Sequence, residues 1–351
     1  MKKLIVLFFS VLINANISLN AQSGEPFMKY SFAPLLTSTI KDVEATTTNG
    51  SITVTGVDAT EAVVEMYVSR NNEFPRNRRR NNSAGDDIKD ILEEDYTIDI
   101  KVEDGKLIAF ARPKNNIGQQ RLSISFKISV PKQVNSNLNT SNARVEISNL
   151  SGSHSFRTSN GRVEIENVSG VISGSTSNGR VSVTNSSEVI DIRTSNGSIT
   201  VKDCNGNIVL RTSNGTMTLT NLSGNISATT SNGGITANNI NGELRTSTSN
   251  GTVRFNGISG SVDASTSNSS MTVDMKTVSD FVKLTTSNGS VNLSLPADRG
   301  YDLNARGDRV ETSGLKNFSG KMDNKNLNGK IADGGATIDV NTSGRANLMF
   351  R

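Results

Sequence analysis

Hydrophobic and polar residues alternate along most of this chain, and in its second half the alternation repeats with a fixed period. The tripeptide Thr-Ser-Asn begins at every eighteenth position, eight times in succession, and recurs once more after a two-residue insertion. The starts are Thr140, Thr158, Thr176, Thr194, Thr212, Thr230, Thr248, Thr266 and, after the insertion, Thr286. A fixed period of this size is typical of repeat proteins, in which each unit stacks on the last.

Apolar residues keep the same register inside every repeat. One column contains Val145, Val163, Val181, Ile199, Met217, Ile235, Val253 and Met271, and a matching apolar column lies two residues further on. A column in the second half of the repeat contains Ile172, Ile190, Ile208, Ile226, Leu244 and Val262. Alternation with a period of two indicates strands with one buried face. Each repeat is therefore expected to form two short strands and two turns.

Two architectures are compatible with such strands, because Asn-Gly also favours hairpins. In an antiparallel meander, equivalent residues of successive repeats would lie two strands apart, about 9.6 Å, whereas in a solenoid they are neighbours at about 4.8 Å. Matching columns are expected only between neighbours. We therefore predict an all-β fold, a single-stranded parallel β-helix or β-solenoid with one eighteen-residue repeat per coil. Right-handed coils are expected, since parallel crossovers are usually right-handed.

The asparagine of each Thr-Ser-Asn corner forms a column of its own. Its members are Asn142, Asn160, Asn178, Asn196, Asn214, Asn232, Asn250, Asn268 and Asn288. Asparagine and glycine tolerate the left-handed backbone of a tight corner, and stacked amides can hydrogen-bond along the axis. We predict a structural turn ladder, with ligand binding by these amides as the alternative.

The start of the chain is typical of a secretory signal peptide. Lys2 and Lys3 precede an apolar run from Leu4 to Ile13, and Ala21 precedes Gln22. Such a leader is removed after export. No later segment has the roughly 20 apolar residues of a membrane-spanning helix. The protein is expected to be exported to the periplasm, the outer surface or the medium, and not to span a membrane.

The rest of the chain is expected to fall into four segments. They are a lead-in over 22–45, irregular β coils over 46–130, regular repeats over 131–295, and C-terminal β coils with a cap over 296–351. The irregular segment contains a basic insertion with Arg76, Arg78, Arg79 and Arg80. A basic run is usually a solvated loop, and contact with an anionic surface such as lipopolysaccharide or acidic glycan is the alternative. Residues 86–95 then predict a short amphipathic helix that could cover an end of the solenoid.

Composition argues against several kinds of chemistry. The net charge of +4 falls to about +2 without the leader, so no nucleic-acid partner is expected. The single histidine, His154, and the single cysteine, Cys204, occupy inward columns and are expected to pack in the core. A single cysteine excludes an internal disulfide, and one cysteine with one histidine is too few for a Cys/His metal cluster. Because His154 is expected to face inward, no Ser-His-Asp triad is expected. We expect no cofactor and no metal.

Charged residues also form columns in the repeats. The acidic pair Glu164 and Glu166 lies beside a stripe containing Arg144, Arg162 and Arg180. Such columns are usually solubilising surface pairs. Because β-helices include polysaccharide-cleaving enzymes with clustered carboxylates, a glycan-active site is the alternative.

Four sequence features together resemble a known family. They are the signal peptide, the Thr-Thr-Asn-Gly-x-Ile-x-Val segment at 47–54, the Leu-Ser-Ile-Ser-Phe-Lys-Ile-Ser-Val-Pro segment at 122–131, and the serial Thr-Ser-Asn-Gly corners. Over about residues 40–345 the chain resembles the bacterial putative-adhesin family, a domain of unknown function. The resemblance implies an exported β-helical protein with an adhesive or surface role, and the family offers no catalytic residues to carry over.

The prediction is thus a non-catalytic, adhesin-like surface or periplasmic solenoid that binds or assembles through its outer strand faces. A cell-envelope glycan or protein is the candidate partner. The alternatives are a polysaccharide-active enzyme of the β-helix type and a self-assembling structural protein of the envelope.

Overall fold

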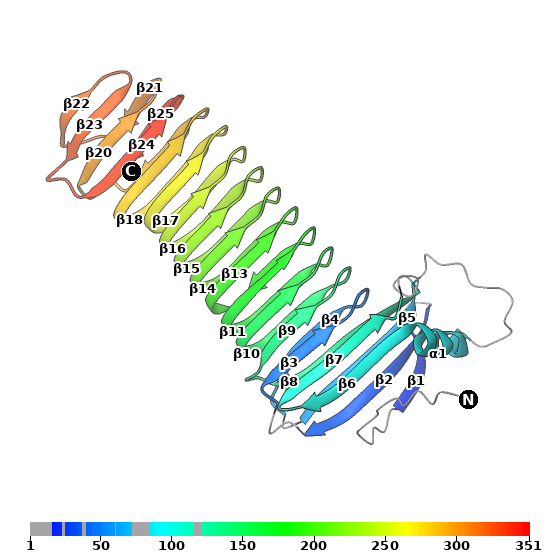
Figure 1. Ribbon diagram of the computed structural model, residues 1–351. Helices are drawn as coiled ribbons and strands as arrows, with labels where there is room; N and C mark the ends of the chain where they lie inside the picture. The colour runs from blue at the N-terminus through cyan, green and yellow to red at the C-terminus, as the bar shows by residue number, and fades with distance from the viewer. Residues whose placement is uncertain (1–15, 23–24, 37–39, 60, 72–83, 116–120) are drawn as a thin grey trace. The chain divides into compact units, whose positions relative to one another are not determined.

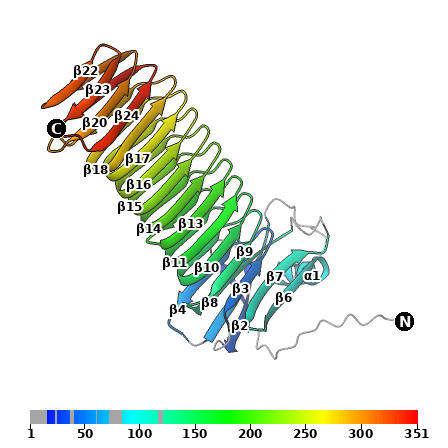
Figure 2. The ribbon, with the colours of Figure 1, turned by 60° about the vertical axis from the view of Figure 1, so that its left-hand side comes forward.

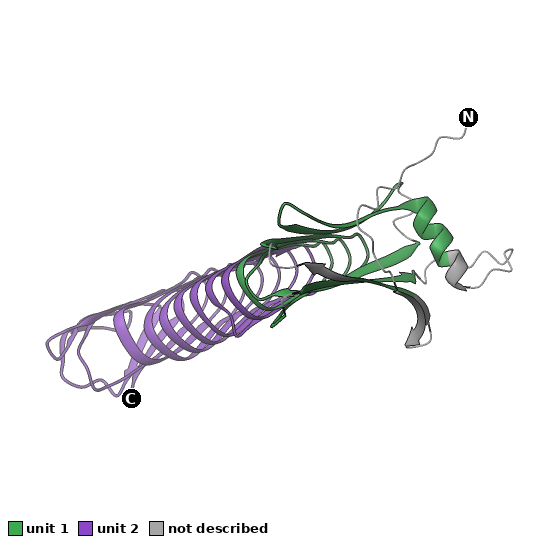
Figure 3. Ribbon diagram, turned by 90° about the horizontal axis from the view of Figure 1, so that it is seen from below, with its two compact units in different colours: residues 1–161 green, residues 162–351 purple. Residues whose placement is uncertain are grey.

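The computed structural model describes residues 16–22, 25–36, 40–59, 61–71, 84–115 and 121–351. The chain forms two compact units, residues 1–161 and 162–351 (Figure 3). Within the described ranges there are 25 strands and one helix, which confirms the all-β expectation. None of the helices in these ranges is both long and apolar enough to cross a bilayer.

The first two thirds of unit 2 are stacked coils whose strands pair in parallel (Figure 1). The strands are β11 (Val163–Thr176), β12 (Val181–Thr184), β13 (Ser187–Thr194), β14 (Ile199–Arg211), β15 (Met217–Thr229), β16 (Ile235–Ser247), β17 (Val253–Thr266) and β18 (Met271–Thr286). Val181 pairs with Val163 and Ile199, its equivalents in the preceding and following repeats. Parallel pairing at this offset rules out the antiparallel meander for these residues.

The core of these coils is built from the inward columns read from the sequence. Val181, Ile199 and Ile208 have no exposed surface, while the residues between them on each strand face outward. Burial of these aliphatic side chains supplies the main stabilisation of each coil. The threonine of each corner is also buried, and from Thr176 to Thr248 it accepts a hydrogen bond from the glycine three residues later, as in Gly215 N to Thr212 Oγ1 at 3.1 Å.

The corner asparagines do not have left-handed backbone, which corrects the expectation for them. The left-handed residues lie seven positions later, at the second bend, with φ between 49° and 56°. They are Asn149, Asn167, Asn185, Asp203, Asn221 and Asn239. The corner glycine is needed for a different reason, because a Cβ on Gly215 would lie 1.8 Å from the Gly197 carbonyl oxygen. Close stacking of backbone, and not a positive φ, therefore selects glycine at the corner.

Unit 1 contains coils whose order in space differs from their order in the chain (Figure 1). Its elements are β1 (Asn16–Gln22), β2 (Glu25–Leu36), β3 (Asp42–Thr46), β4 (Ile52–Val57), β5 (Glu61–Arg70), α1 (Ala84–Asp95), β6 (Tyr96–Glu103), β7 (Lys106–Pro113), β8 (Leu122–Pro131), β9 (Asn135–Asn139) and β10 (Val145–Arg157). Strand β3 lies between β7 and β9, and β4 lies between β8 and β10, all in parallel. The expectation that each coil stacks on the one before it in the sequence is therefore wrong for the coil formed by β3 and β4.

Unit 1 also contains antiparallel strands and the helix, which lies beside β6 (Figure 2). Strand β5 pairs with β2 and β8, β6 pairs with β7, and β1 pairs with β2. The predicted helix is confirmed as α1, which packs against β2, β5, β6 and β8 with Ile88, Ile91 and Leu92 buried. Strand β1 includes residues 16–21 of the expected leader, and the rest of that leader lies outside the described residues.

Unit 2 ends with a second rearranged set of coils. Its last strands are β19 (Val291–Leu295), β20 (Tyr301–Arg306), β21 (Arg309–Ser313), β22 (Phe318–Met322), β23 (Asn326–Ile331), β24 (Ala336–Thr342) and β25 (Arg345–Phe350). Strand β24 lies between β18 and β20, and β25 between β19 and β21, all in parallel. Strand β23 pairs antiparallel with β20 and β22. Here too the chain does not stack in serial order.

Candidate functional site

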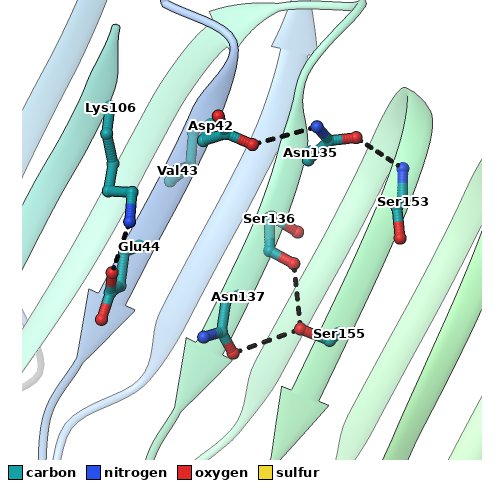
Figure 4. A pocket seen from close by; sticks show the side chains of 9 residues that line it. All are labelled: Asp42, Val43, Glu44, Lys106, Asn135, Ser136, Asn137, Ser153 and Ser155. Carbon is teal, nitrogen blue, oxygen red and sulfur yellow. Dashed lines mark hydrogen bonds and ion pairs between the residues drawn. The ribbon is translucent and has the colours of Figure 1, made fainter. Parts of the chain in front are cut away.

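A shallow polar hollow lies on the outer face of unit 1, over strands β3, β7, β9 and β10 (Figure 4). Its volume is about 430 Å³. The lining residues are Asp42, Val43, Glu44, Lys106, Asn135, Ser136, Asn137, Ser153 and Ser155. Seven of these nine residues carry side chains on the outer face, and none of the nine is aromatic.

The strand period places these side chains in two rows across three coils. Residues two apart on a strand face the same side, and the parallel register puts Asn135 beside Asp42 and Asn137 beside Glu44. Ser155 lies beside Asn137 in the same way. One row is therefore Asp42, Asn135 and Ser153, and the other is Glu44, Asn137 and Ser155 (Figure 4). Neighbouring side chains of a row are about 4.8 Å apart along the stack.

Hydrogen bonds within the first row orient its side chains. Asn135 Nδ2 donates to Asp42 Oδ1 at 3.0 Å, and the Ser153 amide donates to Asn135 Oδ1 at 2.9 Å. One Asp42 oxygen and the Ser153 hydroxyl face the hollow without taking part in these two bonds. This row can therefore both accept and donate hydrogen bonds to a polar ligand.

The second row carries most of the charge. Lys106 Nζ lies 3.4 Å from Glu44 Oε2, and both side chains are partly exposed. Ser155 Oγ donates to Asn137 Oδ1 at 3.2 Å, which leaves the Asn137 amide nitrogen available as a donor. With Asp42, the hollow holds two carboxylates and one ammonium group, so its net charge is negative. This balance suits neutral or cationic groups better than anions.

A buried polar pair lies beneath the hollow. His154 has no exposed surface, and its Nδ1 is 3.0 Å from Ser136 Oγ, while its Nε2 has no hydrogen-bond partner among the described residues. Burial lowers the pKa of His154 from 6.5 to about 4 because the charged ring would lose its hydration. The expected packing role is confirmed, although the side chain is fully rather than partly buried.

The predicted asparagine ladder exists in both units, on the exposed corners. In unit 1, Asn142 Nδ2 donates to Asn49 Oδ1 at 2.7 Å, and Asn160 Nδ2 donates to Asn142 Oδ1 at 2.8 Å. In unit 2, each amide from Asn196 to Asn288 donates to the corner asparagine of the preceding coil at 2.7–2.9 Å. These amides bond to one another, which supports the structural interpretation.

A second amide ladder runs along the left-handed bend and was missed in the sequence. Asn185 Nδ2 donates to Asn167 Oδ1 at 2.6 Å, and Asn239 Nδ2 donates to Asn221 Oδ1 at 3.1 Å. Asn221 Nδ2 donates in turn to the carboxylate of Asp203 at 2.7 Å. Its signal was an asparagine or aspartate recurring once per repeat between two apolar columns. That column could have been recognised with the first.

The other candidate residues are not among those that line the hollow. Arg162 Nη1 is 3.4 Å from Glu164 Oε1, a surface ion pair of the kind expected for these columns. Cys204 is buried, its Sγ donates to the Lys202 carbonyl at 3.1 Å, and burial raises its thiol pKa. Arg76, Arg78, Arg79 and Arg80 lie outside the described residues. In the described part of the chain, no three His, Cys, Asp or Glu side chains form a group that could hold a metal ion.

Comparisons with known proteins add little to this geometry. No family model matches the chain, and no curated protein matches it. Among solved structures, the chain is similar to one from Clostridium sporogenes described as a putative cell adhesion protein, at 10% identity and a TM-score of 0.24. The match covers 92% of this chain and 99% of the other. The family suggested by the corner motifs stays a prediction.

Proposed function

We propose that this protein is a non-catalytic, adhesin-like binding protein, exported to the periplasm or cell surface, and that the hollow in unit 1 is its ligand contact. In this proposal the parallel coils are a right-handed β-solenoid with one sequence repeat per coil, which serves as a scaffold. The observation that carries the proposal is the pair of polar rows in the hollow. Their side chains are oriented by neighbours and still offer hydrogen-bonding groups to solvent.

The arrangement favours a neutral polyhydroxylated ligand such as a cell-envelope glycan. Sugar hydroxyl groups both donate and accept hydrogen bonds. The two rows offer carboxylate oxygens as acceptors, and amide and serine groups as donors and acceptors. Each row crosses three coils, so an extended chain of sugar units could bond to successive side chains of a row. The lack of aromatic residues among the lining side chains favours recognition through hydrogen bonds rather than through stacking on a ring.

The experiment is an array of cell-envelope polysaccharides probed with the purified chain, with retention and cleavage both measured. Retention without cleavage supports the proposal. The double variant Asn137→Ala with Ser153→Ala should then lose retention, because it removes donors from both rows. Asn225→Ala is the matched control, an exposed outward asparagine of unit 2 on β15.

Two other outcomes would contradict the proposal. Cleavage that disappears in a Glu164→Gln and Glu166→Gln variant would establish the polysaccharide-active alternative. Absence of retention, together with light scattering that shows growth of assemblies with concentration, would establish the self-assembling alternative.

A further inference from the structure

The last residues of the chain do not lie at the end of the stack of coils in unit 2. Strands β24 and β25, which span 336–350, are inserted between β18–β19 on one side and β20–β21 on the other (Figure 1). Both strands are therefore hydrogen-bonded along both edges. A chain end is ordinarily the first part of a repeat array to fray, because it has only one neighbour.

Side chains reinforce the backbone ladders on both sides of this inserted coil. Asn347 Nδ2 donates to Asn292 Oδ1 at 3.4 Å on the β19 side, and Asn304 Nδ2 donates to Asp339 Oδ1 at 3.2 Å on the β20 side. Ile338 and Val340 are buried, with relative exposures of 0% and 1%. The terminal Arg351 amide donates to the Leu295 carbonyl at 3.0 Å.

The strands that precede this inserted coil in the sequence, β20 to β23, lie on the side of it that faces away from the regular coils. Among the described strands, β20 pairs with β24 and β23, and β21 pairs with β25. Strand β22 reaches the sheet only through β23. Residues 301–331 therefore extend the sheet of the regular coils only by way of β24 and β25.

We propose that β24–β25 is a keystone coil: residues 336–350 must dock before residues 301–331 can order, and their docking closes the edge of β18 and β19. Without the keystone coil that edge would present unpaired N–H and C=O groups, which template pairing with other chains.

Hydrogen exchange of the full chain followed by mass spectrometry tests the proposal directly. Amides of 336–350 should exchange roughly tenfold more slowly than those of 301–313 and 318–331, although they are closer to the C-terminus. Faster exchange over 336–350 than over 301–313 would overturn the proposal.

Two matched variants provide a second test that does not depend on global folding. Leu303 and Ile338 are cross-strand neighbours on β20 and β24, and both are buried. Ile338→Ala should raise exchange over 336–350 and also over 301–331. Leu303→Ala should raise exchange over 301–331 alone, since β24 keeps its ladder with β18. The reverse pattern, in which Leu303→Ala exposes 336–350 and Ile338→Ala spares 301–331, is what serial stacking predicts and would contradict the keystone role.

Discussion

The regular coils of unit 2 and the rearranged coils of unit 1 both stack parallel strands on a buried apolar face, but they differ in which parts of the chain are paired. From β12 to β17, successive strands pair in parallel at a constant offset of one repeat, as in Ile199 with Val181 and Met217. In unit 1, β4 pairs with β10 across a separation of 93 residues, as in Val145 with Ile52. The side-chain alternation and the threonine-asparagine corner are common to both regions.

The difference shows what a sequence period specifies. Where neighbours in space are neighbours in the chain, identical columns pack against one another and the period is maintained. Where a coil is inserted from a distant part of the chain, each contact still needs an inward apolar side chain, but nothing requires a constant spacing. The corner amide of Asn142 bonds to Asn49 at 2.7 Å, much like those inside the periodic coils.

The largest expected effect comes from placing a charge inside a regular coil. Ile208→Asp should abolish cooperative folding or cost more than about 4 kcal/mol, because Ile208 has no exposed surface and the carboxylate would be unpaired. Thermal melting followed by circular dichroism measures this. Asn207→Asp, on the exposed face of the same strand, is the control and should melt as the parent does. An unchanged melting temperature for Ile208→Asp would refute the inward assignment.

Acid should destabilise unit 1 through His154. The pKa of His154 is about 4 in the folded chain and near 6.5 when unfolded, so the unfolded state takes up a proton first as pH falls. The stability that His154 maintains above pH 6.5 is lost between about pH 6.5 and 4, at most about 3 kcal/mol.

Urea unfolding at a series of pH values checks this expectation. A double variant, His154→Leu with Ser136→Ala, removes the buried polar pair. Its free energy of unfolding should therefore change less than that of the parent between about pH 6.5 and 4. A profile with the same slope in parent and variant would show that other groups cause the acid effect.

Backbone stacking at the corners predicts a smaller loss that depends on position. A Cβ on Gly233 would lie 1.8 Å from the Gly215 carbonyl oxygen, whereas a Cβ on Gly234 would lie 3.2 Å from the Thr252 carbonyl oxygen. Gly233→Ala should therefore cost about 2 kcal/mol, and Gly234→Ala markedly less. Denaturant midpoints of the two variants provide the comparison, and equal midpoints would disprove the close-approach explanation.

Replacing one ladder asparagine by alanine should give the smallest of these stability losses, and the loss should differ between the two amide ladders. Asn239 has φ of 54° and Asn232 is not left-handed, although both side chains donate one ladder bond. Asn239→Ala should cost about 1–2 kcal/mol, because alanine strains the left-handed backbone as well as losing the bond. Asn232→Ala should cost about 0.5–1 kcal/mol. Asn239→Gly should cost less stability than Asn239→Ala, because glycine adopts the left-handed backbone without strain. Equal losses for the two variants would show that backbone strain does not contribute.

Much of the regular region could be predicted from the sequence. The inward columns, the corner threonines and the amide ladder follow from residue identity at a fixed spacing, because stacked coils place equivalent residues in contact. The helix over 84–95 was also predictable from its apolar spacing. The role assigned to the corner backbone was wrong, because a left-handed turn and a close backbone approach both select glycine, and the sequence alone does not distinguish them.

The candidate site could not be predicted in this way. Asp42, Asn135 and Ser153 belong to three strands, and Asp42 is 93 residues from Asn135, whose amide donates to it. Their individual residue types are ordinary for exposed strand positions. Only the insertion of β3 between β7 and β9 brings them into one hollow.

The sequence by itself determined the strand period, the buried faces and the repeat-to-repeat pairing of the regular coils, because these depend on local alternation and on contacts between successive repeats. The tertiary structure alone decided which coil lies next to which at the two ends of the chain, and with it the hollow in unit 1 and the keystone coil in unit 2. The physical reason is that backbone hydrogen bonds between parallel strands are the same for any pair of sequences. Their pattern does not identify a partner when the repeat is lost, so the partner is set by how the whole chain closes its edges.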